Sequence, residues 1–298
     1  MPYTQQISRA TPACFLFLLD HSQSMEEPIG GSDEKKCDAL ATALNAWLNN
    51  MIFACSRSEG VRDFFEIAAL SYGTDGQNNP IIHTAFQGEL ANCGETFLKI
   101  GSQIHQHPLR TVQKEQSYYD PETGQLVSQP IEVIEWIEPG LSGGTPMAAA
   151  LYQACLMLDQ WIETHRTCFP PIVIHITDGE STDADPVEYA SAVTQRFTDD
   201  GNVLLFNCHL SAIAADKIMF HHSSELLPDA FAKTLFQMSS VLPDAFLQGA
   251  KKEGFQLQTG ARGFAFNADI VDLIKFLDVG TKVVEPGTKV SSGEEQLR

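Results

Sequence analysis

The chain has 298 residues, of which 43% are hydrophobic, so it is long enough to bury a substantial core within one large domain. Its formal net charge is −19, because 38 Asp and Glu residues face only 19 Lys and Arg residues. Such a charge repels phosphate backbones and anionic lipid surfaces while it attracts cations to acidic clefts. We therefore expect neither a nucleic-acid partner nor a membrane partner.

Three further features of the sequence predict a cytoplasmic location. The first segment, "MPYTQQISRATPA", lacks the basic start and apolar middle of a secretory signal. No apolar stretch approaches the length of a membrane-spanning helix. The seven cysteines are scattered without CxxC spacing, mostly among apolar neighbours, which favours reduced core thiols over disulfides or zinc ligands.

The first half of the chain begins with a strand, a helix and a hairpin. The continuous apolar run "CFLFLLD" (Cys14–Asp20) predicts a parallel strand that is buried on both faces. Apolar residues at helical spacing predict an amphipathic helix over Asp33–Ala54. Two strands, Phe65–Gly73 and Ile81–Phe86, are joined by the polar turn "TDGQNNP" and predict a hairpin.

Strand and helix continue to alternate in the second half. A helix is expected over Met147–Ile162, with Pro146 at its first position and Thr145 as the cap before it. "PIVIHITDG" (Pro171–Gly179) predicts a second buried strand. The remaining predicted elements are a helix over Pro186–Phe197, a strand over Val203–Ser211, helices between Pro228 and Lys252, a strand "GFAFNA" and a helix over Ala268–Leu277. This alternation predicts a doubly wound, mostly parallel α/β sheet with helices on both faces.

Some segments depart from this alternation. We expect residues 13–280 to form the domain, after a lead over residues 1–12 and before a disordered tail over 281–298. Residues from about 101 to 140 predict a hairpin insertion that turns at "DPETGQ". Because it precedes Thr145 in the chain, we expect this hairpin to overhang the carboxyl ends of the strands. The repeated "LPDAF" at Leu227 and Leu242 is interpreted as two helix starts rather than a recognition repeat.

Three polar loops, "DHSQS", "SGGTP" and "TDGE", fall where ligands bind in open α/β sheets, outside the carboxyl ends of the strands. They supply oxygen-bearing side chains without an obligatory imidazole or thiolate: Asp20, Ser22, Ser24, Thr145 and Asp178. Such hard oxygen ligands suit Mg²⁺, with Mn²⁺ or Ca²⁺ as alternatives, far better than zinc or copper. The alternate spacing of the first three residues lets several of them converge on one ion.

This pattern resembles the von Willebrand factor A (vWA) domain family and its metal-ion-dependent adhesion site (MIDAS). The matching elements are Asp-x-Ser-x-Ser, then a Thr before a helix, then Asp-Gly, in the chain order of the family and within residues 13–279. By this resemblance Ser22, Ser24 and Thr145 would be direct ligands, while Asp20 and Asp178 would hold the ion largely through water. The open coordination position would accept an acidic side chain of a partner protein.

The segments "GGTPM" and "ITDGEST" look most like the stand-alone cytoplasmic bacterial members, including those associated with tellurium resistance or with kinases and phosphatases. That resemblance implies a role in a bacterial stress-response or signalling system. We expect a partner-binding rim around the metal, formed by His21, Gly144, Gly179 and Glu180. A ring of acidic residues is also expected there: Glu26, Glu27, Asp183 and Asp185.

Structural explanations for the same residues remain open, because Asp20 and Ser22 also suit a turn, Asp178–Gly179 suits an ordinary turn and Thr145 suits a helix cap. For function, we expect a non-enzymatic, divalent-cation-dependent protein-binding module. An adaptor of an AAA+ ATPase or of a chelatase-like remodelling complex is the first alternative. A metal-dependent hydrolase is the second. Catalysis is disfavoured because the chain has no G-x-S-x-G elbow, P-loop or complete dinucleotide fingerprint, and because Ser22 stands where a haloacid-dehalogenase phosphotransferase needs an Asp.

Overall fold

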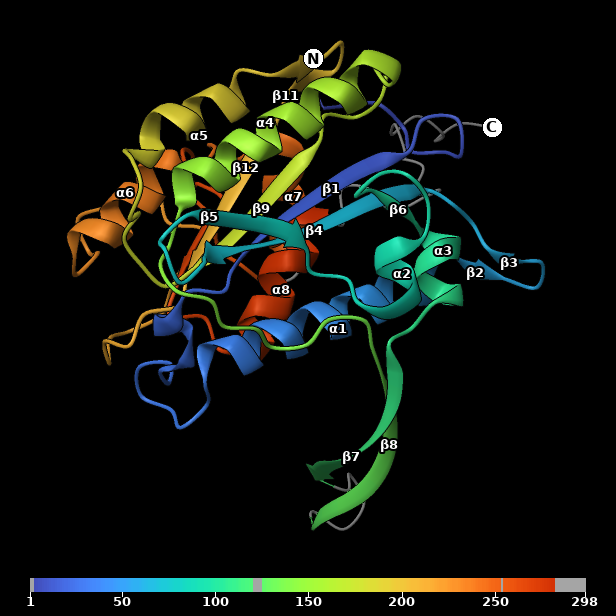
Figure 1. Cartoon of the computed structure of the whole chain (residues 1–298), viewed down its shortest axis with the longest axis horizontal. Coiled ribbons are helices and arrows are strands. Elements are labelled where there is room, and N and C mark those ends of the chain that lie inside the picture. Colours follow the sequence, from blue (N-terminus) through green and yellow to red (C-terminus); the bar gives the residue numbers. More distant parts are fainter. Residues whose placement is uncertain (1–2, 120–124, 253, 282–298) are drawn as a thin grey trace, which may run out of the picture.

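The computed structural model describes residues 3–119, 125–252 and 254–281, and its centre is an eight-stranded sheet (Figure 1). Its strands are β1 (Ala13–Asp20), β4 (Phe65–Thr74), β5 (Pro80–Thr84), β6 (Lys99–Ile100), β9 (Ile172–Thr177), β12 (Leu204–His209), β13 (Ile218–Met219) and β14 (Phe264–Phe266). The strand order is β13–β14–β12–β9–β1–β4–β5, with β6 also paired to β4. The pairs among β4, β1, β9, β12 and β14 are parallel, while β5, β6 and β13 pair antiparallel.

Helices cover both faces of the sheet. They are α1 (Lys36–Cys55), α2 (Gly88–Asn92), α3 (Gly101–Gln106), α4 (Met147–Thr164), α5 (Pro186–Thr194), α6 (Ala230–Met238), α7 (Asp244–Lys252) and α8 (Ile270–Thr281). Figure 1 shows α4, α5 and α6 on one side of the sheet and α1 and α8 on the other. The predicted doubly wound, mostly parallel α/β architecture is confirmed. None of the helices in the described residues is both long and apolar enough to cross a lipid bilayer.

Strand β1 lies at the centre of two hydrophobic cores. Because successive side chains of a strand point to opposite faces, Phe15 and Phe17 enter the core under α1, while Leu16 and Leu18 enter the core under α4. The rings of Phe15 and Phe17 pack edge-on against Trp47 of α1, with centroids 5.7 and 4.9 Å apart. Full burial of each such ring contributes about 2 kcal/mol. The unbroken apolar run in the sequence therefore reflects a strand covered on both sides.

The order in which the chain adds strands to the sheet reverses at β1. The chain runs from β1 to β4 on one side of β1 and then returns to its other side to form β9. Leu19 pairs with Ile176, so Asp20 and Asp178 leave the sheet at the same edge. In open α/β sheets, this kind of switch point opens a crevice between the loops after the two strands.

The predicted insertion is a long two-stranded hairpin, β7 (Arg110–Tyr119) and β8 (Leu126–Glu135). Its flanks belong to the core, because the Trp136 indole N–H donates to the Ile104 carbonyl of α3 at 2.6 Å and Trp136 is 1% exposed. The hairpin therefore occupies only the middle of the 101–140 range. Most of the predicted "DPETGQ" turn lies outside the described residues.

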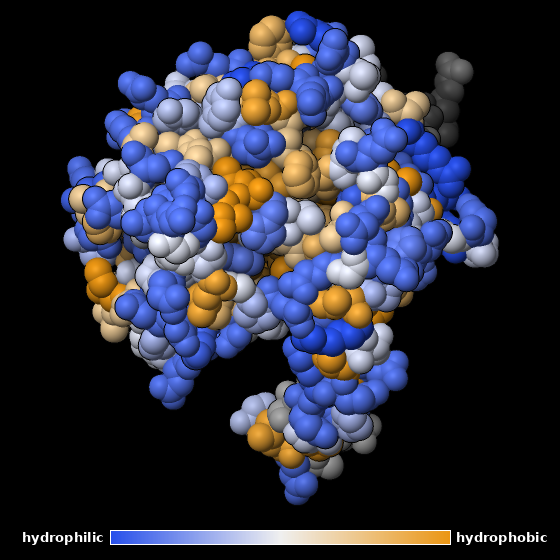
Figure 2. Space-filling model, viewed as in Figure 1, coloured by the Kyte–Doolittle hydropathy of each residue, from blue (hydrophilic) through white to orange (hydrophobic). Residues whose placement is uncertain are grey.

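The hairpin extends away from the sheet on the side of α1, and in Figure 2 it stands clear of the rest of the surface. The loops at the carboxyl ends of β1 and β9 lie at another part of the molecule (Figure 1). The prediction that the hairpin overhangs these loops is therefore wrong. The main-chain N–H of Trp136 donates to Asn45 Oδ1, which anchors the end of the hairpin beside the middle of α1. The chain continues to Thr145 only after this anchor.

Short elements complete the fold: the 3-10 helix η1 (Gln23–Glu26) and the small hairpins β2 (Ser56–Arg57)–β3 (Gly60–Val61) and β10 (Phe197–Thr198)–β11 (Gly201–Asn202). The lead before β1 packs on the last of these, because Tyr3 and Gln5 N–H groups donate to the carbonyl and side chain of Asp200. Each "LPDAF" contains a helix start, as predicted, because α6 begins at Ala230 and α7 at Asp244. Thr281, the first residue of the predicted disordered tail, instead ends α8, and the rest of the tail, from 282 onward, lies outside the described residues.

Candidate metal centre

Asp20 ends β1 and its carboxylate is fixed by two hydrogen bonds. Its Oδ1 accepts the Ser22 N–H at 2.8 Å and its Oδ2 accepts the Thr177 hydroxyl at 2.5 Å. The residue is 0% exposed. Burial raises the pKa of Asp20 to about 6, and the negative charge of Asp178 adds to the rise. A buried carboxylate with a raised pKa gains stability from any cation that approaches it.

The loop after β1 meets the loop after β9 through its serine side chains. Ser22 Oγ and Ser24 Oγ are 3.1 Å apart, and the Ser24 hydroxyl donates to Asp178 Oδ1 at 2.9 Å across a sequence separation of 154 residues. Together with the Asp20–Ser22 contact, these bonds bring four of the five predicted ligands into one connected cluster. The alternative that these residues serve only to form turns fits their local geometry, but it does not account for the contact between the two loops.

Thr145 lies in the third loop, which is held against both others. The Gln23 N–H of η1 donates to the Gly143 carbonyl at 2.8 Å, and the Thr145 N–H donates to the Thr182 hydroxyl at 3.0 Å. Gly143 has φ +49°, and a Cβ there would lie 2.2 Å from Thr74 Oγ1, so only glycine allows this approach. Among the described residues, no hydrogen bond holds the Thr145 hydroxyl, although the residue is only 5% exposed.

The start of α4 is capped by a residue other than the predicted one. The Ala148 and Ala149 N–H groups donate to the two carboxylate oxygens of Asp183, at 3.1 and 2.9 Å. Pro146 stands before the helix instead of at its first position, and the Thr145 hydroxyl does not cap it. Asp183 satisfies these N–H groups from the loop after β9, which leaves the Thr145 hydroxyl available to a ligand.

The acidic ring is also smaller than predicted. Asp183 is bound to α4, and Asp185 caps α5 by accepting the Val187 N–H at 3.0 Å. Glu26, the last residue of η1, and Glu27, which follows it, remain on the surface, where they pair with Lys35 and Lys36 respectively. The carboxylates of the predicted ring are therefore engaged in helix capping and ion pairs.

Lys36 belongs to the candidate site and is a residue that the sequence analysis missed. Its ammonium lies 2.8 Å from Asp178 Oδ2, and the two side chains are only 2% and 1% exposed. It also donates to the Ser24 carbonyl at 3.2 Å and to Glu27 Oε2 at 3.3 Å. The adjacent Lys35 is half exposed, so in sequence the pair "KK" is typical of a solvated helix start. The only signal was the position of the pair, at the first turn of the helix that follows the "DHSQS" loop.

His209 at the end of β12 holds the main chain of Asp178. Its Nε2–H donates to the Asp178 carbonyl at 3.1 Å, and burial lowers the pKa of its imidazole. Its Nδ1 is buried and has no hydrogen-bond partner among the residues that the structure describes. The residue therefore positions the loop after β9 from the side of β12.

The donor set fits a hard divalent cation. It offers two carboxylates and three hydroxyls, which are the oxygen ligands that Mg²⁺, Mn²⁺ and Ca²⁺ prefer. Within the described part of the chain, no group of three or more His, Cys, Asp or Glu side chains is placed to hold a metal. Asp20, Ser22, Ser24, Thr145 and Asp178 are thus the residues that would hold such an ion, and Lys36 offsets one of the two negative charges.

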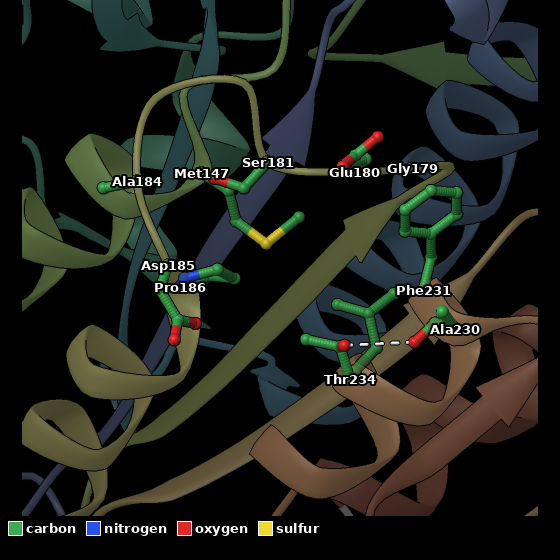
Figure 3. A pocket seen from close by; sticks show the side chains of 11 residues that line it. Met147, Gly179, Glu180, Ser181, Ala184, Asp185, Pro186, Ala230, Phe231 and Thr234 are labelled. Atoms are coloured by element: carbon green, nitrogen blue, oxygen red, sulfur yellow. Dashed lines mark hydrogen bonds between the residues drawn. The ribbon is translucent and has the colours of Figure 1, made fainter.

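The predicted rim residues are divided between two pockets. Gly179 and Glu180 line a pocket of about 350 Å³ between the loop after β9 and α6, where the Met147 and Phe231 side chains lie on opposite sides (Figure 3). His21 instead lines a pocket of about 570 Å³ with His83. Burial, followed by the charge of His83, lowers the pKa of His21 to about 4.

Gly144 is the fourth predicted rim residue and lies between these regions. Its N–H donates to Thr74 Oγ1 at 2.7 Å. The rim is therefore split, with His21 on the β5 side and Gly179 and Glu180 on the α6 side.

The sequence matches no protein-family model and no curated protein. Among solved structures, proximal thread matrix protein 1 from the mussel byssus is 12% identical, with a TM-score of 0.46 over 95% of this chain and 50% of that one. The ArnB paralogue VWA2 from Sulfolobus acidocaldarius is 13% identical, with a TM-score of 0.37 over 89% of this chain and 44% of that one. The vWF domain of the type V pili tip protein Mfa5 from Porphyromonas gingivalis is 14% identical, with a TM-score of 0.30 over 57% and 39%.

The chain thus spans about half, or less, of the length of these proteins. At such identities and TM-scores, the likeness concerns the general fold alone. The fold assignment itself rests on the strand order and register given above.

Proposed function

We propose that this chain is a non-enzymatic, divalent-cation-dependent protein-binding module of the vWA type. Asp20, Ser22, Ser24, Thr145 and Asp178 would hold the ion, with Mg²⁺ as the preferred cation and Mn²⁺ or Ca²⁺ as alternatives. The observation that carries this proposal is the Ser24–Asp178 hydrogen bond, which joins two loops 154 residues apart at the switch point of the sheet. In open α/β sheets, ligands bind in the crevice at such a switch point.

The charge balance of the site supports a protein partner. Asp20 and Asp178 contribute two negative charges, of which Lys36 offsets one, so a divalent ion held there would stay electrophilic. When bound, the ion would supply a centre that accepts a carboxylate from outside. Ser24 is exposed, which leaves the cluster open to an acidic side chain of another protein.

The pocket beside Asp178 supplies further contact surface. It begins at Gly179 and Glu180, directly after Asp178, and continues over the exposed ring of Phe231, which is 40% exposed. Residues that flank the partner's carboxylate would lie against this surface. Their apolar side chains would be matched by Met147 and Phe231 (Figure 3).

The first test is thermal unfolding in excess EDTA and then in several concentrations of Mg²⁺ or Mn²⁺. A ligand at about 100 times its dissociation constant that binds only the folded state adds about 2.7 kcal/mol. We expect this gain in the wild type and not in Asp20→Ala. Asp199→Ala is the matched control, because it removes an exposed carboxylate that pairs with Arg166 far from the site in sequence. Equal gains in all three proteins would show that the ion binds elsewhere and would refute the proposal.

The second test identifies the partner class. Immobilised protein would be exposed to cell extract with Mg²⁺ or EDTA, and with or without ATP. Capture that needs Mg²⁺ and is lost in Asp20→Ala supports the binding module, and a kinase or phosphatase component among the captured proteins fits a signalling role. Capture of an AAA+ ATPase that depends on ATP would instead support the adaptor alternative. Phosphoester turnover by the purified protein, lost in Asp20→Ala, would support the hydrolase and overturn the non-enzymatic proposal.

A further inference from the structure

Lys36 places a positive charge where the proposed ion needs a ligand. The two oxygens of Asp178 are both occupied, Oδ1 by the Ser24 hydroxyl and Oδ2 by the Lys36 ammonium. A hydroxyl can rotate and turn a lone pair toward a cation, whereas an ammonium has only donors. Among the described residues, the Lys36–Asp178 contact therefore places a positive charge directly beside the proposed cation.

We infer that Lys36 is an internal cation that competes with the divalent ion for Asp178, so that metal occupancy moves its ammonium toward Glu27. This inference rests on the proposed function, because it concerns the same metal centre. It goes further, since it assigns to one side chain the control of metal affinity and a coupling between metal occupancy and the start of α1.

The competition follows from burial. Lys36 is 2% exposed, so its charge is poorly screened by water, and like charges that share one carboxylate repel strongly in a medium of low dielectric constant. The ammonium already neutralises Asp178, which removes part of the attraction that a divalent ion would gain. Lys36 therefore lowers the affinity of the centre and raises the metal concentration at which it fills.

Glu27 gives the displaced ammonium somewhere to go. Its Oε2 is 3.3 Å from Lys36 Nζ, and its side chain is 59% exposed, so it can follow the ammonium outward. The main chains of the two residues are also joined, since the Lys36 N–H donates to the Glu27 carbonyl at 3.1 Å. A move of the ammonium from Asp178 to Glu27 thus keeps the lysine paired and changes the connection between η1 and α1.

The decisive experiment compares the metal affinity of Lys36→Met with that of Lys35→Met. Binding of Mn²⁺ would be measured by electron paramagnetic resonance and binding of Mg²⁺ by calorimetry. Lys35 is the matched control, because it has the same charge and the next position in the chain but is half exposed and pairs with Glu26. We expect Lys36→Met to bind roughly tenfold more tightly than the wild type or more, and Lys35→Met to bind like the wild type.

A second pair of variants tests the route of the ammonium. Glu27→Gln removes the negative charge that would attract the displaced ammonium, so we expect it to weaken metal binding more than Glu26→Gln, which removes an equal charge that pairs with Lys35. Both glutamates are surface residues, so these variants keep the inference testable even if Lys36→Met does not fold. Circular dichroism in EDTA would verify the fold of each variant.

The outcomes separate this inference from the proposed function. Measurable and equal metal affinity in the wild type, Lys36→Met and Lys35→Met would overturn the role of Lys36 and leave the metal centre standing. Equal weakening by Glu27→Gln and Glu26→Gln would overturn the route through Glu27. No binding in any folded variant would overturn both the inference and the metal centre. Binding that appears only in Lys36→Met would support the inference in its strongest form.

Discussion

Two polar clusters adjoin in the central sheet: one at the loops after β1 and β9, and a deeper one that links side chains of β4, β9 and β12. The deeper cluster is a continuous chain of hydrogen bonds: Tyr72 O–H to His175 Nε2 at 2.7 Å, His175 Nδ1–H to Asn207 Oδ1 at 2.9 Å, and Asn207 Nδ2 to Ser239 Oγ at 2.9 Å. Ser239 then donates to the Leu235 carbonyl of α6 at 2.7 Å. Every member is neutral and has a partner within the chain.

The edge cluster is built on a different principle. It carries the charges of Asp20, Asp178 and Lys36, and its Thr145 hydroxyl has no hydrogen bond among the described residues. Tyr72 and Asp20 are paired residues of adjacent strands, so the two clusters are direct neighbours. Buried polar groups therefore indicate a candidate binding site when they carry charge or have lone pairs without a hydrogen-bond donor, because a bound ligand can then satisfy them.

The largest expected effect breaks the charge balance of the edge cluster. Lys36→Met leaves the buried Asp178 carboxylate unpaired, which costs about 3–5 kcal/mol of unfolding free energy for a buried pair. Urea unfolding in EDTA measures this loss. Lys35→Met should unfold almost like the wild type, because its ammonium is exposed to solvent. Similar losses in the two variants would contradict the buried ion pair.

The deeper cluster should respond to acid. Burial lowers the pKa of His175 to about 4, below the ordinary value of 6.5, so on acidification the unfolded chain takes up the proton first. The stability that His175 contributes is present above pH 6.5 and is lost as the pH falls to about 4, by about 3 kcal/mol. His175→Gln should lack this loss. The difference in unfolding free energy between the two proteins, measured from pH 7.5 to 4, would show no trend if His175 titrated normally.

Asp20 should respond in the opposite sense. Because burial raises its pKa to about 6, the folded chain takes up this proton first, and its contribution is present below about pH 4 and lost as the pH rises through 6. Asp20→Asn should therefore be more stable than the wild type in EDTA at pH 7.5. The expected gain is about 1–2 kcal/mol, because the amide keeps only part of the hydrogen bonding to Thr177 and Ser22. A lower unfolding free energy for Asp20→Asn than for the wild type, at pH 7.5 in EDTA, would show that burial does not destabilise the Asp20 carboxylate.

The smallest expected effect on stability sharpens the comparison most directly. Thr145→Val removes a hydroxyl that makes no hydrogen bond with any residue the structure describes, and it should change the unfolding free energy in EDTA by less than about 0.5 kcal/mol. Thr177→Val is the matched variant and should cost about 1–2 kcal/mol, because it leaves Asp20 Oδ2 without its donor. Only Thr145→Val should then weaken Mg²⁺ binding without destabilising the metal-free protein. Equal costs for the two variants would remove the distinction between the hydroxyls.

The sequence was sufficient for the parts of the fold that follow from hydrophobic period. The apolar run before Asp20 predicted a strand covered on both faces, and the alternation of elements predicted the parallel sheet whose strand ends bring Ser24 to Asp178. Residue types at the strand ends predicted the oxygen-rich cluster because loops after parallel strands meet at one edge.

The remaining features depend on contacts between distant segments. Lys36 looks like any lysine at a helix start, and only the fold shows that its ammonium is directed inward onto Asp178. Thr145 was predicted to cap α4 because caps are local preferences, yet the N–H groups at the start of α4 donate to Asp183, which lies 35 residues beyond Ala148. The direction of the β7–β8 hairpin was mispredicted because chain proximity to Thr145 says nothing of the Asn45 contact that anchors its base.

The antiparallel base of the hairpin has a consequence for how this protein can diverge. Arg110 and Glu135 are paired residues, so the chain leaves and re-enters the domain at neighbouring points about 5 Å apart. An appendage with such a narrow base can lengthen, shorten or change its surface while Trp136 and the core beneath it stay in place. Sequence changes in the β7–β8 hairpin therefore leave the loops at the switch point undisturbed, and the two regions can evolve at independent rates.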